Sequence, residues 1–269
     1  MKPGLPKTRK ERLAAALAVL AALCAVDGLL LEPNWIEVTH HSLSAHVAQP
    51  LKIAHLTDLH TKGLGFRERR LLKLLALEKP DLIVITGDTI SSTGTYQQES
   101  DMLRQLHAPL GVWLVRGNWE NVKTLRGEGE FYRANGVHFL PNRSAAARPD
   151  VWLTGINDTT GTSAEVERAI ASVPANTFRI ALFHSPAFFS ESAVQYDLGL
   201  AGHSHGGQVR IPFWGPLWLP SGVGPYRDGW FAAGERRMYV SRGIGTSLLP
   251  VRFACRPELA IITIQPMAN

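Results

Sequence analysis

The chain has 269 residues, of which 45% are hydrophobic and 19% charged, so it can bury a sizeable core in one domain and lacks the composition of a disordered protein. Residues 1–31 carry a net +3 of the formal +5, so the rest of the chain has too little positive charge to predict a nucleic-acid partner. Two cysteines, Cys24 and Cys255, exclude a disulfide framework and a cysteine-based metal site.

An apolar run, Leu13–Leu31, follows the basic N-terminus and is interrupted only by an Asp-Gly pair. As a helix it spans about 28 Å, close to the hydrocarbon thickness of a bilayer. An uncleaved membrane anchor is preferred over a cleaved signal peptide with its apolar region at Leu13–Val26, because no small-residue cleavage pattern follows. A buried helix of a soluble protein ranks third. We expect a basic flank and anchor over residues 1–31 and one domain over residues 32–269.

The sequence leaves the side of the membrane open. A helix that spans the bilayer places the body opposite the basic flank, because positive charge stays on the cytoplasmic side. Asp27 within the apolar run also permits a shallow helix in the membrane interface, and the body would then stay in the cytoplasm.

Beyond Pro33, segments with the hydrophobic pattern of strands alternate with segments that have the pattern of helices. The predicted strands, in chain order, are residues 51–60, 81–88, 111–118, 151–158, 178–186, 237–243 and 258–265. The predicted helices are residues 66–79, 97–107, 130–136 and 163–173, the last with Ser163 as its N-cap. Helical crossovers early in the chain and hairpin-like strands late predict a mixed α/β fold in which two mixed β-sheets pack between helices.

Five of the early strands end in short polar turns, with the sequences TDLH, TGDT, RGNWE, FHSP and AGHSHGG. Because ligand sites in open α/β sheets lie beyond the carboxyl ends of the strands, we expect these turns to meet at one edge. Their two carboxylates, one amide and four imidazoles are Asp58, His60, Asp88, Asn118, His184, His203 and His205. This set suits two divalent cations of borderline character, such as manganese, iron, cobalt, nickel or zinc. In an extended segment residues i and i+2 point the same way, so Asp58 would pair with His60, and His203 with His205.

The turns also form a series of motifs: Asp58-Leu59-His60, Gly87-Asp88, Gly117-Asn118-Trp119-Glu120, His184 and Gly202-His203-Ser204-His205. In this order they resemble the motifs of the calcineurin-like metallophosphoesterases, from about Leu51 to about Gln265. Residues 202–208, 241–245 and 255–264 are most similar to a membrane-anchored bacterial branch, which includes phosphodiesterases and UDP-2,3-diacylglucosamine pyrophosphatases of lipid A biosynthesis. The resemblance implies a calcineurin-like phosphoesterase sandwich and a location at the bacterial inner membrane.

The resemblance also assigns roles to the seven side chains. One metal ion would bind Asp58, His60 and His205, and the other Asn118, His184 and His203. Asp88 would bridge the two ions, with manganese as the first choice of metal, and Asp88, Asn118 and His184 would be catalytic. The implied activity is hydrolysis of phosphodiester or pyrophosphate bonds by a metal-bridging hydroxide. The substrate would be a phosphorylated small molecule or a lipid such as UDP-2,3-diacylglucosamine; no oligomeric state is predicted.

One position departs from the family pattern. Trp119 stands where the family commonly has a histidine that helps the leaving oxygen to depart, and an indole cannot transfer a proton in that way. The sequence therefore favours pyrophosphates and activated diesters, whose leaving groups need less protonation. The alternative is a non-catalytic, metal-bearing membrane module that binds phosphorylated lipid or a partner protein, with Trp119 marking lost catalysis.

Three further features each have two interpretations. The aromatic segment 211–231 is either a lipid-facing lid or a cap packed over the sheet. Its tryptophans are Trp214, Trp218 and Trp230. Gly206 and Gly207 either permit a tight turn or turn their amides toward phosphate. Arg242 is either structural or a ligand for a substrate phosphate.

Overall fold

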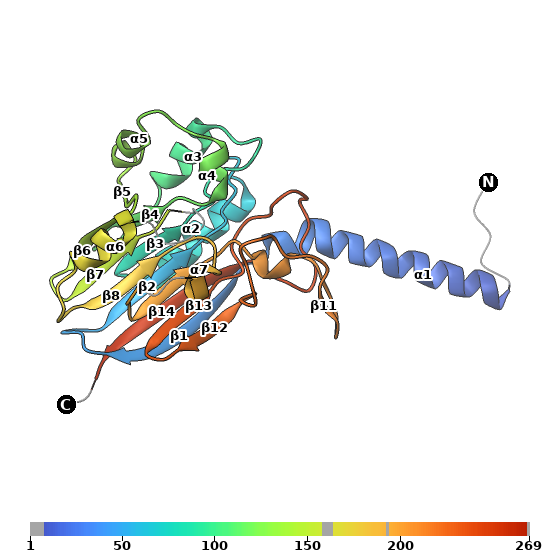
Figure 1. Ribbon diagram of the computed structural model, residues 1–269. Helices are drawn as coiled ribbons and strands as arrows, with labels where there is room; N and C mark the ends of the chain where they lie inside the picture. Colours follow the sequence, from blue (N-terminus) through green and yellow to red (C-terminus); the bar gives the residue numbers. More distant parts are fainter. Residues whose placement is uncertain (1–7, 158–163, 192–193, 268–269) are drawn as a thin grey trace.

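The computed structural model describes residues 8–157, 164–191 and 194–267. Within these residues, two six-stranded β-sheets pack against each other and helices cover their outer faces (Figure 1). The predicted mixed α/β fold with two sheets between helices is confirmed. Lys2 and Lys7 of the basic flank, Asp158 at a predicted strand end and the predicted cap Ser163 lie outside the described residues.

In the first sheet, four parallel strands lie beside a pair of longer strands that run in the opposite direction. Its strands, in spatial order, are β1 (Glu37–Ala45), β14 (Glu258–Pro266), β2 (Leu51–Leu56), β3 (Leu82–Thr86), β4 (Val112–Val115) and β5 (Val137–Phe139). Strands β2 to β5 are parallel, and between them lie α2 (Phe66–Glu78), α3 (Tyr96–Leu103), α4 (Asn118–Val122) and α5 (Glu128–Ala134). Strand β14 runs antiparallel to β2 and parallel to β1.

The second sheet has parallel strands in its centre and antiparallel strands at both edges. Its order is β12 (Gly229–Ala233), β13 (Arg236–Val240), β9 (Leu198–Ala201), β8 (Phe178–Leu182), β7 (Val151–Gly155) and β6 (Arg143–Arg148). Helices α6 (Ala164–Ala171) and α7 (Phe188–Glu191) contribute to its outer face. A small separate ladder joins β10 (Arg210–Ile211) to β11 (Gly215–Pro216).

The largest apolar core lies between the two sheets and contains, for example, Ile53 and Ile262 from the first and Ile180 and Leu200 from the second. Two smaller cores lie under the helices on the outer faces. Burying one large aliphatic side chain contributes about 1.5–3 kcal/mol, so this packing fixes the relative position of the sheets. The carboxyl ends of β2, β3, β4, β8 and β9 consequently meet at one edge of the sandwich.

Several strands differ from the expectation, and the short strands β5 and β6 are among those that were not predicted. Strand β1 has no counterpart among the predicted strands, because its sequence EVTHHSLSA is mostly polar, as suits a half-buried edge strand. The two late strands were expected to be hairpin-like, and this expectation is wrong, because β13 and β14 lie in different sheets. Strand β13 forms a hairpin with β12, which was not among the predicted strands, and β14 returns to the first sheet, where it pairs with β1 along its whole length.

The apolar N-terminal run forms a helix that projects from the body (Figure 1). Helix α1 (Arg9–Val26) begins at the capping residue Thr8 and continues into a π-helical turn (Asp27–Leu31) and a 3-10 turn (Glu32–Asn34). No residue of α1 is buried, so the helix does not belong to the core of this chain. It is long and apolar enough to cross a membrane.

The end of this helical segment is attached to the body by specific contacts. The carbonyl of Gly28 accepts a hydrogen bond from the Arg252 amide, with an N···O distance of 2.9 Å. The buried carboxylate of Glu32 accepts from the amide of Ala254 at 2.8 Å and from the amide of Cys255. The junction is therefore a packed part of the fold and not a flexible linker.

Candidate metal centre

All seven predicted site residues lie at the edge where the strands of the two sheets end. Asp58 and His60 follow β2, Asp88 follows β3 and Asn118 follows β4. His184 follows β8 in the second sheet, and His203 and His205 follow β9. The five turns thus converge as expected, although they come from two sheets. Asn118 and His203 are partly exposed, whereas the other five side chains are buried.

The backbone of these turns is left-handed at five of the seven residues. Their φ angles are 52° for Asp58, 43° for His60, 55° for Asp88, 66° for His203 and 48° for His205. The expected extended i and i+2 geometry is therefore wrong for both pairs, Asp58 with His60 and His203 with His205, because all four residues have a left-handed backbone. Side chains other than glycine rarely adopt this conformation, which costs about 1–3 kcal/mol per residue and is concentrated at functional sites.

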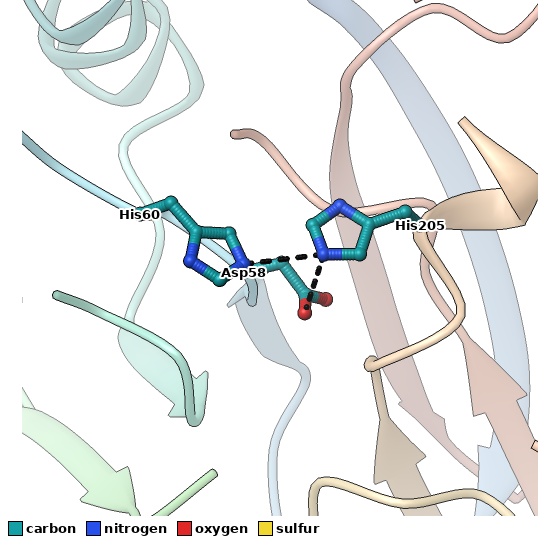
Figure 2. Close-up of side chains that lie close together, drawn as sticks. All are labelled: Asp58, His60 and His205. Atoms are coloured by element: carbon teal, nitrogen blue, oxygen red, sulfur yellow. Dashed lines mark hydrogen bonds and ion pairs between the residues drawn. The ribbon is translucent and has the colours of Figure 1, made fainter. Parts of the chain in front are cut away.

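The first group of ligand atoms comes from Asp58, His60 and His205 (Figure 2). The Nε2 atoms of the two imidazoles are 3.2 Å apart, and Nε2 of His205 lies 3.3 Å from Oδ1 of Asp58. Burial lowers the pKa of His60 to about 4 and that of His205 well below its ordinary value, so both rings are neutral and offer lone pairs. Oδ1 of Asp58 is buried and has no hydrogen-bond donor among the described residues. These atoms fit a bound cation.

The second group comes from Asp88, His184 and His203, with Asn118 beside them. Nδ1 of His184 donates to the Thr86 carbonyl at 2.7 Å, and Nε2 of His203 donates to the Ser221 carbonyl at 2.7 Å. In the neutral rings, the other two nitrogens therefore carry lone pairs, and they face each other at 3.0 Å.

Two more acceptor atoms approach the same point. Oδ1 of Asn118 lies 3.1 Å from Nε2 of His184. Oδ2 of Asp88 lies 3.3 Å from the same nitrogen. Four acceptors at such distances repel one another unless a proton or a cation lies among them. Imidazole, amide and carboxylate ligands together suit a divalent transition metal.

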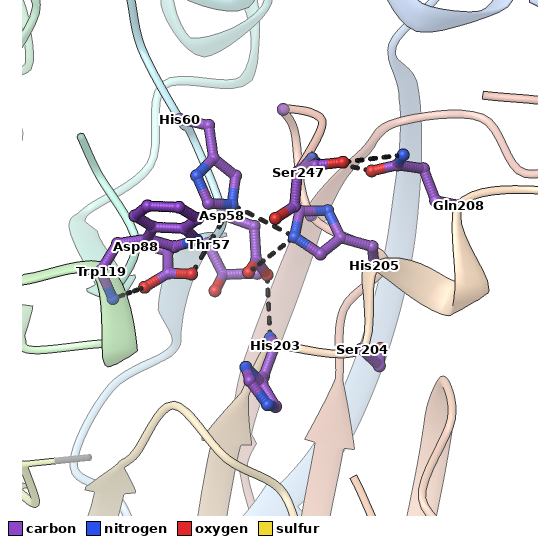
Figure 3. Close-up of polar contacts among 12 residues, drawn as sticks. Thr57, Asp58, His60, Asp88, Trp119, His203, Ser204, His205, Gln208 and Ser247 are labelled. Atoms are coloured by element: carbon purple, nitrogen blue, oxygen red, sulfur yellow. Dashed lines mark hydrogen bonds and ion pairs between the residues drawn. The ribbon is translucent and has the colours of Figure 1, made fainter. Parts of the chain in front are cut away.

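Asp88 lies between the two groups. Its Oδ2 atom is 3.3 Å from Nε2 of His184 and 3.6 Å from Nε2 of His60, whereas its Oδ1 atom accepts from the Trp119 amide at 2.9 Å (Figure 3). Asp88 is thus placed to contact a cation in either group.

Glu120 positions the turns, a role that the sequence analysis did not assign to it. Its carboxylate accepts hydrogen bonds from the amides of Asp88 at 2.9 Å, Thr89 at 2.7 Å and Gly117 at 2.7 Å. It therefore ties the turn after β3 to the turn after β4. The available signal was its place as the last letter of the Gly-Asn-Trp-Glu motif.

Arg252, which was also not predicted from the sequence, positions the backbone next to the Asp58 turn. It is fully buried, and its guanidinium group donates to the carbonyls of Gly243 at 3.1 Å and Gly245 at 2.6 Å. The amide of Gly245 in turn donates to the Asp58 carbonyl at 2.6 Å. No pattern in the local sequence distinguishes this arginine from one at the surface.

The structure decides two of the open alternatives. Gly206 and Gly207 have φ angles of 60° and 83°, and their amides donate to the side chain and carbonyl of Ser204, so these glycines permit a tight turn and do not turn their amides toward phosphate. Arg242 forms ion pairs with Glu37 at 2.9 Å and Glu258 at 3.1 Å, which makes it structural.

A pocket of about 160 Å³ opens above the ligand atoms. It is lined by Asp88, Asn118, Trp119, His203, His205, Trp218, Pro220, Ser247 and Leu248. A larger hollow of about 750 Å³ lies elsewhere, beside Trp113 and His138, so volume alone does not locate the site. Trp214 and Trp218 are 86% and 61% exposed, so neither is packed as a cap over the sheet, whereas Trp230 contacts Tyr239.

Comparisons with known proteins agree with this geometry. Residues 51–207 match the family model described as calcineurin-like phosphoesterase. The chain is 33% identical to the uncharacterized metallophosphoesterase YkuE of Bacillus subtilis, over 87% of each chain. It is 32% identical to phosphodiesterase YaeI of Escherichia coli, over 87% of this chain and 90% of the relative. It is 23% identical to the UDP-2,3-diacylglucosamine pyrophosphatase LpxG of Chlamydia trachomatis, over 86% and 90%.

The position of Asp88 between the two groups predicts that Asp88→Asn impairs metal binding more than any other single ligand change, because it removes negative charge from both groups at once. Loss of an outer partner already weakens metal binding by about 10- to 100-fold, so we expect more than about 100-fold here. Manganese titration of the purified variants measures this. Asp101→Asn on α3, which makes the same chemical change away from the site, is the matched control. If Asp88→Asn still bound two equivalents of manganese tightly, the assignment would be refuted.

Proposed function

Because the chain belongs to the calcineurin-like phosphoesterase family, we propose that it hydrolyses phosphodiester or pyrophosphate bonds with two divalent cations held side by side. The observation that carries this proposal is the pair of ligand groups that share Asp88, with one carboxylate oxygen near a histidine of each. A single group would suit one ion, whereas the pair suits a centre that acts on both sides of a phosphorus atom.

In this proposal Asp58, His60 and His205 hold one cation, Asn118, His184 and His203 hold the other, and Asp88 contacts both. The two cations would supply positive charge to the phosphoryl oxygens and lower the pKa of an attacking water. Manganese is the first choice of metal, and iron, zinc, cobalt and nickel suit the same donors.

The residues of the chain have separate tasks in this reaction. The Thr86 and Ser221 carbonyls fix the tautomers of His184 and His203, so that the ligand nitrogens need no proton rearrangement. Trp119 lines the pocket and keeps its amide on Asp88, while its ring offers no titratable proton. The leaving group must therefore depart largely without an acid from this position, which favours pyrophosphates and activated diesters.

The proposed substrate is lipid-linked and the proposed location is the bacterial inner membrane. Helix α1 has the length and composition of a membrane anchor, and one relative, matched over 86% of this chain, is named for UDP-2,3-diacylglucosamine. With residues 1–31 as flank and anchor, a spanning helix would place the body outside the cytoplasm, while that substrate requires access from the cytoplasm. A fusion reporter at the C-terminus distinguishes the two sides.

Hydrolysis of bis-p-nitrophenyl phosphate by the full chain in detergent tests the activity. We expect turnover that depends on added Mn²⁺, and a loss of more than about 100-fold in His184→Ala, because this variant removes one ligand of the second group. Leu77→Ala, at an exposed position of α2, is the control. A chain that binds manganese but gives no metal-dependent turnover would support the non-catalytic module and refute the proposal.

Trp119→His tests the leaving-group argument. A histidine at this position can protonate a departing alkoxide, so the rate on alkyl phosphomonoesters should rise by roughly 100-fold, while pyrophosphate hydrolysis changes little. Trp119→Phe keeps an apolar ring without a titratable proton and should give no such rise. The role given to Trp119 would be contradicted if the rate on alkyl phosphomonoesters rose equally in Trp119→His and Trp119→Phe. It would also be contradicted if Trp119→His changed the rates on phosphomonoesters and pyrophosphates equally.

A further inference from the structure

Six large apolar side chains are exposed on two neighbouring loops beside the pocket. We call them the apolar rim: Phe213, Trp214, Leu217, Trp218, Leu248 and Leu249. Each is at least 61% exposed. Scattered apolar residues are normal on a protein surface, but a group of this kind marks an interaction site.

The rim lies beside the end of the apolar helix. Gly28 is within the run Leu13–Leu31, and a Cβ atom built on it would lie 3.3 Å from Cγ2 of Val251. The Arg252 amide donates to the Gly28 carbonyl. The segment that carries Leu248 and Leu249 therefore runs next to the last turns of the helix, at the depth where a spanning helix leaves the hydrocarbon.

Side-chain and backbone contacts hold the two loops together. The side-chain nitrogen of Gln208 donates to the Ser247 carbonyl at 3.1 Å, and its side-chain oxygen accepts from the Ser247 amide at 2.8 Å (Figure 3). The same nitrogen also donates to the Leu249 carbonyl at 3.1 Å. The Arg210 amide donates to the Phe253 carbonyl at 2.8 Å. The rim thus has a fixed position relative to the junction.

The loop that contains β10 and β11 rests directly on the metal-centre turn. A Cβ atom on Gly207 would lie 2.2 Å from Cβ of Pro216, so only glycine allows this approach. In Figure 1 this loop projects from the same side of the body as α1. The orientation of the helix therefore fixes where both the rim and the pocket face.

The junction carries groups typical of a membrane boundary. Trp35 is 61% exposed and follows the helical segment directly. The guanidinium carbon of Arg256 lies 4.4 Å from the centre of its ring. Tryptophan and arginine commonly occupy the headgroup level, where the indole meets apolar chains and the cation meets phosphate.

We propose that the apolar rim inserts at the boundary between headgroups and acyl chains of the same bilayer that α1 enters, so that the pocket opens at the level of the lipid phosphates. This inference rests on the proposed membrane anchor. Trp218 and Leu248 belong to both the rim and the pocket wall, so an acyl chain of a lipid substrate can contact them while its phosphoester reaches the ligand atoms. The occupant of the rim is the phospholipid bilayer itself.

Tryptophan fluorescence of the full chain in phosphatidylcholine vesicles with brominated acyl chains tests this inference, because bromine quenches only indoles that reach it. The emission of a single tryptophan is the difference between the spectrum of the natural chain and that of the chain in which this tryptophan is replaced by Phe. We expect the emission of Trp214, obtained from Trp214→Phe, to be strongly quenched, and that of Trp35, obtained from Trp35→Phe, to be quenched as well. The emission of Trp152, obtained from Trp152→Phe, should be unquenched, because β7 lies away from α1 (Figure 1). The double variant Phe213→Asp with Leu217→Asp should abolish the quenching of Trp214, whereas Leu77→Asp on α2 should not.

Equal Trp214 emission in brominated and ordinary lipid, with Trp35 quenched, would overturn the docking of the rim. Both tryptophans unquenched would overturn it together with the anchor. Neither result affects the metal-dependent hydrolysis of a soluble diester, so failure of this inference and failure of the proposed function remain distinguishable. Persistent quenching of Trp214 in the double aspartate variant would also contradict the proposal.

Discussion

The site depends on one constraint: its buried ligand atoms are nearly all hydrogen-bond acceptors, and too few protons lie among them to offset their mutual repulsion. Two buried carboxylates and four histidines meet at one edge, and the carbonyls of Thr86 and Ser221 fix two of those rings with their lone pairs inward. Leaving an unpaired charge buried costs several kcal/mol. Without cations, burial raises the pKa of Asp58 to about 7, so this carboxyl tends to keep its proton; bound cations would allow both carboxylates to ionise.

The surrounding structure holds these repelling groups in place. Glu120 accepts hydrogen bonds from the amides of Asp88 and Gly117 and so joins two of the turns. Arg252 donates to the Gly245 carbonyl, and the Gly245 amide in turn donates to the Asp58 carbonyl. Arg252 also connects the site to the N-terminal helical segment, because its own amide binds the Gly28 carbonyl. The end of the N-terminal helical segment and the candidate metal centre are consequently parts of one packed unit, so a membrane that α1 entered would also fix the orientation of the body.

The sequence predicted the fold class and all seven convergent residues because both depend on local patterns, namely alternating strands and helices and polar residues at strand ends. Three features were beyond it. The left-handed turns at Asp58 and His203 depend on the packing around them, and edge strand β1 has no hydrophobic pattern. The burial of Arg252 depends on tertiary contacts that its local sequence does not indicate. The exposure of Trp214 likewise depends on tertiary packing, which composition does not determine.

Electron paramagnetic resonance of the purified chain titrated with Mn²⁺ tests the central claim that two cations share Asp88. Ions that share a carboxylate are close enough for their spins to couple, so the account predicts that the hyperfine spectrum of isolated Mn²⁺ gives way to a coupled spectrum as the second equivalent binds. If two equivalents bind and the spectrum remains that of isolated ions, the shared centre does not exist.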